Sequence, residues 1–170
     1  MTTPLEFAKA LLSAGGWPQS DNNLKAVVAW EALEGGHWYN TAFFNPMNTM
    51  QTMPGSHSFN NKPDPQVQSY PDWDTGLAAT LKTLQNGLYN DAIDALAASA
   101  DPVVTINSLK PWTGGISYNT SGIDALFQSY ANKPDPTNSS LSSASGSTLK
   151  KGLSIAALGL LFGILWSKSK

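Results

Sequence analysis

The chain has no cysteine, no arginine and few charged residues of either sign. The lack of cysteine excludes disulfides, a thiol nucleophile and cysteine-based zinc sites. Arginine supplies bidentate contacts to phosphate and guanine, so a chain whose ten basic residues are all lysine is poorly suited to nucleic acid, and we expect no nucleic-acid partner. Charged residues make up 13% of the sequence, roughly half of the ~25% usual in globular proteins. A surface of neutral polar side chains suits a hydroxyl-rich partner better than a polyanion.

Several common catalytic motifs are also missing. The two histidines, His37 and His57, do not belong to a His-Glu-x-x-His pattern, so we expect no zinc site. The sequence has neither the nucleophile elbow of serine hydrolases nor a P-loop. We therefore expect no metal and no cofactor.

Charge and hydrophobicity divide the chain into three parts. Residues 1–132 carry a net charge of −6, whereas the last 22 residues carry +4. We expect a folded domain over residues 1–131, a disordered Ser/Pro-rich linker over residues 132–148 and a C-terminal hydrophobic helix over residues 149–170. As a helix, the uncharged run 152–167 spans about 24 Å, short of the ~30 Å hydrocarbon core of a bilayer. Flanking lysines can extend this length by snorkelling, and we expect a membrane anchor.

Helical periodicity predicts that the domain is mainly α. A capping box at Thr3 opens the first helix, and Gly15-Gly16 ends it. Further helices are predicted from a cap at Asp21 to Glu34, from Asp72, from a cap at Asn90, over residues 101–109 and over residues 122–130.

The segment 37–71 has no helical period and is rich in Asn, Gly, Pro, Met and aromatic residues. We predict an irregular region with a short hairpin. Because structureless segments of this length are usually functional in compact domains, we expect a binding surface there.

Glu34 is the candidate general acid. It closes the second helix at a Gly-Gly break, where the negative end of the helix dipole raises the pKa of a carboxyl group. We expect Trp30, Trp38 and Phe43 to desolvate it further. A raised pKa lets the group keep its proton near neutral pH and donate it to a leaving oxygen. Glu31 projects from nearly the same face and is the alternative acid; the Gly-Gly break favours Glu34.

Five segments follow one another in an order that resembles lysozyme-like domains of phage tail and virion proteins, which are related to soluble lytic transglycosylases and goose-type lysozymes. The similarity covers about residues 5–130, and the order and spacing of the segments carry it. The segments are Trp30 to Gly36, Phe44 to Thr49, Tyr70 to Gly76, Thr83 to Tyr89 and Trp112 to Gly115.

The resemblance implies a lysozyme-like α+β fold with Glu34 as the general acid/base. It also implies six substrate-binding residues, of which Tyr70 and Trp112 are expected to be partly exposed. These residues are Asn48, Thr49, Gln51, Tyr70, Tyr89 and Trp112.

The number of catalytic carboxyl groups stays open. Many glycosidases use two, and Asp72 or Asp74 is a possible partner for Glu34. We prefer to read both as residues that favour the start of their helix. The resembled family uses one glutamate together with the N-acetyl group of the substrate, which leads to hydrolysis or to an internal anhydro ring.

The sequence therefore predicts an enzyme that cleaves bacterial peptidoglycan, carried in a phage particle and acting at the host envelope during genome entry. Residues 152–167 are expected to bind a membrane or virion proteins. One alternative is a catalytically inactive structural virion protein or glycan-binding module with the same fold. Another is a tail-anchored cellular membrane protein without a cell-wall substrate.

Overall fold

A computed structural model describes residues 3–39, 42–63, 65–115 and 117–137 of the chain. Within these ranges the protein is mainly helical, as predicted, with six α-helices, one 3₁₀ turn and one two-stranded sheet. The elements are α1 (Pro4–Gly15), α2 (Asp21–Glu34), β1 (His57–Ser58), β2 (Gln68–Ser69), α3 (Trp73–Leu84), α4 (Asn90–Ala97), α5 (Pro102–Ser108), η1 (Lys110–Thr113) and α6 (Ile123–Tyr130).

Local sequence signals explain where most of these helices begin. The Thr3 hydroxyl accepts a hydrogen bond from the Glu6 amide at 3.2 Å, which confirms the predicted cap of α1. The predicted caps of α2 and α4 were wrong by one residue. Ser20 caps α2 by accepting from Asn23 N, and Asp21 is the first helical residue. The α4 cap is Tyr89, whose side chain makes no capping bond.

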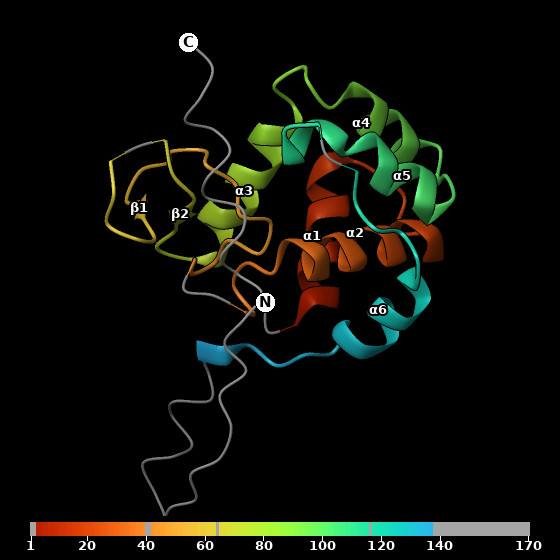
Figure 1. The fold of residues 1–170 in the computed structure, drawn as a ribbon, viewed down its shortest axis with the longest axis horizontal. Helices are drawn as coiled ribbons and strands as arrows, with labels where there is room; N and C mark the ends of the chain where they lie inside the picture. Colours follow the sequence, from red (N-terminus) through yellow and green to blue (C-terminus); the bar gives the residue numbers. More distant parts are fainter. Residues whose placement is uncertain (1–2, 40–41, 64, 116, 138–170) are drawn as a thin grey trace, which may run out of the picture.

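Helix α2 lies at the centre of the helical body and packs against α1, α5 and α6 (Figure 1). The sequence predicts one apolar face for α2, but the structure buries six consecutive residues, 26 to 31, and so encloses most of its circumference. Two of these buried residues, Ala26 and Ala29, are alanines, whose small side chains let neighbouring helices approach closely. The side chain of Asn23 is buried too, and it donates 2.7 Å hydrogen bonds to the carbonyls of Pro18 and Leu96.

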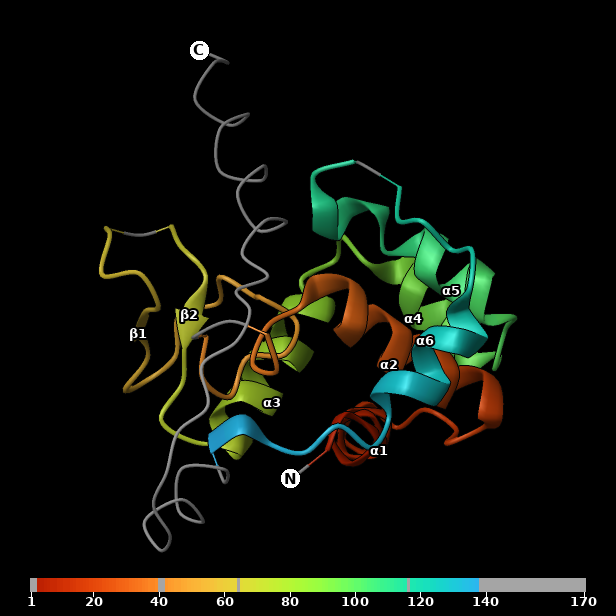
Figure 2. The same cartoon turned by 60° about the horizontal axis from the view of Figure 1, so that its bottom comes forward.

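The irregular segment between α2 and α3 forms a lobe on one side of α3, and the helices α4 to α6 lie on the other side (Figures 1 and 2). The predicted short hairpin is present: β1 and β2 pair antiparallel, with His57 opposite Ser69. Residues 36–39 and 42–49 form the part of this lobe that follows α2.

A buried asparagine holds the lobe together. Asn45 donates from Nδ2 to the carbonyls of Thr49 and Gln68, at 2.9 and 2.6 Å, and its Oδ1 accepts from the Thr49 amide at 3.0 Å. These bonds satisfy backbone groups that have no partner in a helix or sheet ladder. One side chain thus replaces the regular secondary structure that the segment lacks.

The folded body extends beyond the expected boundary at residue 131. We call residues 131–137 the strap; Figure 2 shows it running from α6 back toward α3. Its first carbonyl, that of Ala131, accepts from Leu5 N, and Asp135 is buried. Residues 132–137 therefore differ from the expected linker, because polar groups in the body pair with them.

The remaining expected linker, residues 138–148, and the expected membrane anchor, residues 149–170, lie outside the described residues. In the described ranges, no helix has the length and apolar character needed to cross a membrane.

A glycine sets the contact between α3 and the lobe. A Cβ placed on Gly76 would overlap the backbone carbonyl of Phe44. Helix propensity alone predicts that alanine at this position would stabilise α3 by about 1 kcal/mol. We expect the overlap to reverse the sign, so that Gly76→Ala lowers the free energy of unfolding by about 2 kcal/mol in urea denaturation.

The control is Ala78→Gly, an exposed position of the same helix, where the loss of about 1 kcal/mol reports propensity without a clash. A stabilising effect of Gly76→Ala would contradict the close approach of α3 and Phe44.

Candidate active site

Glu34 is the last residue of α2, as the sequence predicts. The helix stops because Gly35 adopts a left-handed conformation, with φ of 63°, and its amide bonds back to the Glu31 carbonyl at 2.9 Å. The backbone then turns into the lobe, and the Glu34 side chain is half-buried. Glu34 therefore lies at the junction between the helical body and the irregular segment.

Tyr118 is the direct partner of this carboxyl group. Its hydroxyl donates a hydrogen bond to Oε1 of Glu34. Tyr118 lies in the turn region between η1 and α6, 84 residues further along the chain. Because the bond occupies Oε1, Oε2 is the oxygen that remains for a proton.

Burial shifts the pKa of Glu34 into the range that suits a general acid. Desolvation raises its pKa to about 7, and the hydrogen bond from Tyr118 opposes part of this rise because it favours the carboxylate. Near neutral pH the group is thus divided between its two protonation states. A carboxyl group in this condition can both give and take a proton, which is what acid and base catalysis need.

Two of the predicted aromatic residues pack together, and one of them, Tyr89, interacts with the charge of Glu34. The rings of Tyr89 and Trp112 lie 5.2 Å apart, and the Trp112 ring meets the Trp30 ring edge-on at 4.7 Å. The charge of Glu34, together with the larger effect of burial, raises the pKa of Tyr89. Trp112 is partly exposed, as expected, and its indole N–H donates to the Met47 carbonyl at 3.0 Å.

Asn48 also joins this group of residues. Its Nδ2 donates to the backbone carbonyl of Glu34 at 2.6 Å, and its own backbone has a positive φ of 50°. Two backbone bonds lie beside it: Gly36 N donates to Pro46 O and His37 N donates to Asn45 O, both at 3.2 Å. Residues 44–49, which we call the floor loop, are therefore fastened to the chain that follows Glu34.

The other predicted binding residues support the floor loop from within. Thr49 is buried, and its hydroxyl lies 2.7 Å from that of Thr83 in α3. Tyr70 is only 2% exposed, so its expected partial exposure was wrong; its hydroxyl donates to the Gln51 carbonyl at 2.7 Å. Gln51 is half-buried and bonds through its side chain to the Thr52 carbonyl. The Tyr70 ring is buried because removing its apolar surface from water lowers the free energy of the folded state.

Glu31, the alternative acid, is fully buried. Neither carboxyl oxygen has a hydrogen-bond partner among the described residues. Desolvation alone raises the pKa of Glu31 well above its usual value, which favours the protonated form. It is enclosed by protein, whereas Glu34 retains exposed surface, and this difference separates the two candidates.

Asp72 caps α3 by accepting from Thr75 N at 2.8 Å, and this bond holds its pKa below the usual value. Asp74 lies in the first turn of the same helix, where a carboxylate is favoured. Both residues thus have the helix-start role that the sequence analysis preferred for them.

Two aromatic residues expected beside Glu34 surround a histidine instead. His37 is buried, and the rings of Trp38 and Phe43 lie 5.0 and 6.4 Å from its imidazole. Tyr118 and Tyr89 are two residues that interact with the Glu34 carboxyl group. In the described part of the chain no group of three or more His, Asp and Glu side chains is arranged to hold a metal ion.

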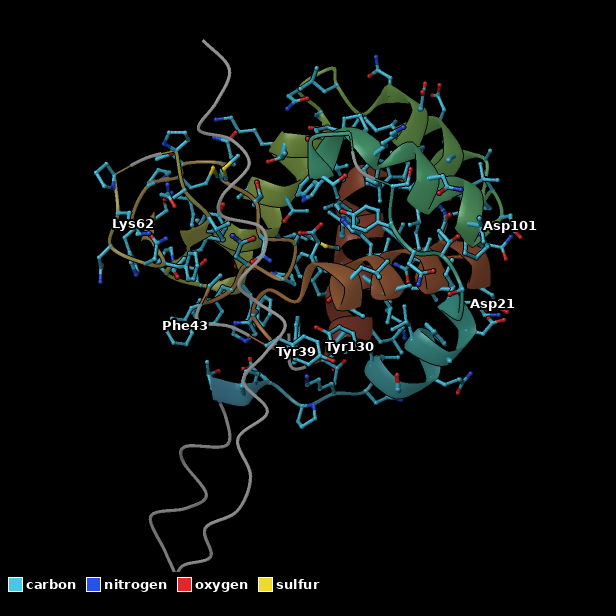
Figure 3. The ribbon with its side chains drawn as sticks, viewed as in Figure 1. Asp21, Tyr39, Phe43, Lys62, Asp101 and Tyr130 are labelled. Carbon is cyan, nitrogen blue, oxygen red and sulfur yellow. The ribbon has the colours of Figure 1, made fainter. Side chains whose placement is uncertain are left out.

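A surface hollow of about 330 Å³ lies away from Glu34, where the first turns of α2, α5 and α6 meet. It is lined by Lys25 and Asp124, which form an ion pair at 2.8 Å, and by Asp101 among others. None of the predicted site residues lines it. Figure 3 shows Asp101 at the edge of the molecule opposite to Lys62 of the lobe.

Sequence reasoning missed Tyr118. No periodic pattern marks residues 117–121, and only tertiary folding brings that turn to the end of α2. A tyrosine a few residues after the Trp112–Gly115 turn was the sole available signal.

No protein-family model, curated protein or solved structure matches the chain.

The hydrogen bond from Tyr118 predicts a measurable change in the titration of Glu34. In Tyr118→Phe the carboxylate loses its donor, so its pKa is expected to rise further above about 7. A ¹³C NMR titration of glutamate carboxyl groups measures this pKa. Tyr89→Phe, which removes a hydroxyl from a neighbouring ring, is the matched control and is expected to shift it much less. An unchanged or lower pKa in Tyr118→Phe would argue against the bond.

Glu31 predicts a pH dependence of stability with a defined sign. Its pKa is raised in the folded state, so above the unfolded value of ~4.3 the unfolded chain releases a proton that the folded chain keeps, and stability falls as pH rises. The slope approaches about 1.4 kcal/mol per pH unit below the folded pKa. We expect Glu31→Gln to remove this slope and to raise the free energy of unfolding at pH 8, measured in urea. Equal pH dependence in the variant and the wild type would contradict the raised pKa of Glu31.

Proposed function

We propose that the chain has a lysozyme-like fold and cleaves the β-1,4 bond between the amino sugars of bacterial peptidoglycan, with Glu34 as the general acid. The observation that carries the proposal is the half-buried carboxyl group at the end of α2, whose pKa of about 7 suits proton donation at neutral pH. The neutral polar composition and the partly exposed Trp112 suit a sugar polymer, which binds through hydrogen bonds and ring stacking.

In the proposed reaction Glu34 donates its proton to the bridging oxygen as the glycosidic bond breaks. The carboxylate left behind gains the full strength of the hydrogen bond from Tyr118, because a charged acceptor binds a hydroxyl more strongly than a neutral one. The same carboxylate then accepts a proton from the attacking group. Tyr118 thus stabilises the charge that forms during bond cleavage.

A single-carboxyl mechanism agrees with the arrangement of the acids. Asp72 is engaged as a helix cap, and Glu31 is enclosed in the core. The proposed mechanism therefore uses the N-acetyl group of the substrate in place of a second carboxylate. Water as the attacking group gives hydrolysis, and the sugar's own hydroxyl gives an anhydro ring.

We further propose that the protein is carried in a phage particle and opens the wall during genome entry. Residues 152–167 are uncharged, with lysines on both sides, and serve in this proposal as an attachment to a membrane or to other virion proteins. The catalytic domain then acts close to the envelope, because residues 152–167 attach it there.

Loss of activity in Glu34→Gln is the primary test of the function. We expect the full chain to reduce the turbidity of purified peptidoglycan, and Glu34→Gln to be slower by at least ~100-fold because the proton donor is gone. The proton must be present in the active form, so the rate is expected to fall as the pH rises above about 7.

Glu31→Gln is the matched control, since it makes the same change three residues away in the same helix. It is expected to keep near-wild-type activity. If Glu31→Gln alone is inactive, Glu34 is the wrong acid. If the wild type is inert on several types of peptidoglycan, the inactive structural or glycan-binding protein is the better interpretation.

A further inference from the structure

His37 is fully buried and is held through both of its ring nitrogens. The Phe44 amide donates to Nδ1 at 2.8 Å, and Nε2 lies 2.9 Å from Oδ1 of Asp135. Phe44 belongs to the floor loop, and Asp135 belongs to the strap. One imidazole thus joins two segments that are about 90 residues apart in the chain.

The two bonds determine which nitrogen carries the proton. A backbone amide is only a donor, so Nδ1 must accept and has no hydrogen. Nε2 must then carry the hydrogen that it donates to Asp135, whose carboxylate is only an acceptor. His37 is therefore the neutral Nε2–H tautomer. Either a second proton or a change of tautomer places a hydrogen on Nδ1, opposite the Phe44 N–H, and breaks that bond.

Asp135 is itself fixed by the strap. The amide and hydroxyl of Thr137 donate to its Oδ1 at 2.8 and 2.6 Å. These bonds and the one from His37 outweigh the opposing effect of desolvation and lower the pKa of Asp135, which stays ionised. Lys133 adds a second attachment of the strap, because its ammonium lies 3.2 Å above the ring of Tyr39. Figure 3 shows Tyr39 beside Tyr130, on which it stacks.

The other neighbours of His37 are aromatic. Phe44 stacks on the imidazole at 5.5 Å, and Trp73 of α3 meets it edge-on at 4.6 Å. The two acids beside Trp73, Asp72 and Asp74, are exposed to water. Among the described groups that contact the imidazole, Asp135 is thus the one that carries a charge. Burial among these aromatic side chains lowers the pKa of His37, which favours the neutral ring.

We propose that the strap is a latch for the floor loop: Asp135 holds His37 in the tautomer that binds the Phe44 amide, and this bond positions the residues next to Glu34. Phe44 is followed by Asn45, whose carbonyl binds His37 N, and by Asn48, whose side chain binds the Glu34 carbonyl. Displacing the strap removes the acceptor of Nε2–H and lets the ring change tautomer. The position of the chain after α6 then controls the order of the floor loop.

The contacts of His37 and Asp135 support the latch whether or not the protein is an enzyme. Its effect on catalysis rests on the proposed function. In the proposed enzyme, Asp135 and His37 are positioning residues, because they reach Glu34 only through the floor loop. Loosening that loop is expected to raise KM for the glycan more than it lowers kcat, since the proton donor itself stays in place.

Replacing Asp135 in the full chain tests the latch directly. We expect ¹⁵N NMR of labelled histidine to show the Nε2–H tautomer for His37 in the wild type, and a mixture of tautomers in Asp135→Ala. Hydrogen exchange of the Phe44 amide is expected to accelerate at least tenfold in that variant. Asp124→Ala is the matched control, because it makes the same change in charge at an exposed residue of α6.

Asp135→Asn separates the latch from a general loss of folding. Its side-chain oxygen still accepts from Nε2–H, so we expect it to restore the wild-type tautomer and slow Phe44 exchange. Wild-type behaviour of both probes in Asp135→Ala would overturn the proposal, and so would failure of Asp135→Asn to restore them in a folded chain.

The NMR measurements also distinguish failure of the latch from failure of the proposed function. If the wild-type chain is inert on peptidoglycan but shows the expected tautomer and exchange, the latch is supported and the proposed enzymatic function is rejected. If the chain is active and Asp135→Ala leaves KM, the tautomer and the exchange rate unchanged, the enzymatic function is supported and the latch is rejected.

Discussion

The irregular segment after α2 must satisfy its backbone groups without a helix or a sheet ladder, and the candidate site depends on how it does so. Two buried side chains perform this task. Asn45 binds three backbone groups of the lobe, and His37 binds the Phe44 amide. Each of these side chains contributes to the stability of the fold mainly by preventing a penalty, because an unpaired buried amide or carbonyl costs about 1–3 kcal/mol. The floor loop keeps its shape beside Glu34 because these groups are paired.

The two glutamates of α2 show how position within one helix separates structure from chemistry. Glu31 is enclosed and has no partner among the described residues, and burial raises its pKa well above the usual value. Glu34 comes at the last turn, where the helix ends and part of the side chain meets solvent. The opposing effects of burial and the Tyr118 bond leave its pKa near 7. A group that titrates at neutral pH and is accessible can exchange protons with a substrate.

Much of the helical framework was predictable because its signals are local. Capping residues, prolines at first turns and left-handed glycines act within one or two turns, and they located α1, α2 and α3 closely. The placement of Glu34 at the end of α2 followed from Gly35 and Gly36. The errors concern long-range contacts. Tyr118 reaches Glu34, and Asp135 reaches His37, only after folding, and no pattern in the sequence encodes those pairs. Burial of Tyr70 and Thr49 was missed because an irregular segment has no periodicity from which inward and outward faces can be assigned.

The central claim is that the end of α2, the floor loop and Trp112 form one surface for an amino-sugar polymer. An NMR titration of full-length Glu34→Gln with soluble peptidoglycan strands tests it most directly, because the variant binds without turnover. The account predicts that the Trp112 indole and the Asn48 side-chain amide shift together and saturate with the same dissociation constant. Shifts confined to the hollow around Lys25 and Asp124, or no shifts at all, would contradict it.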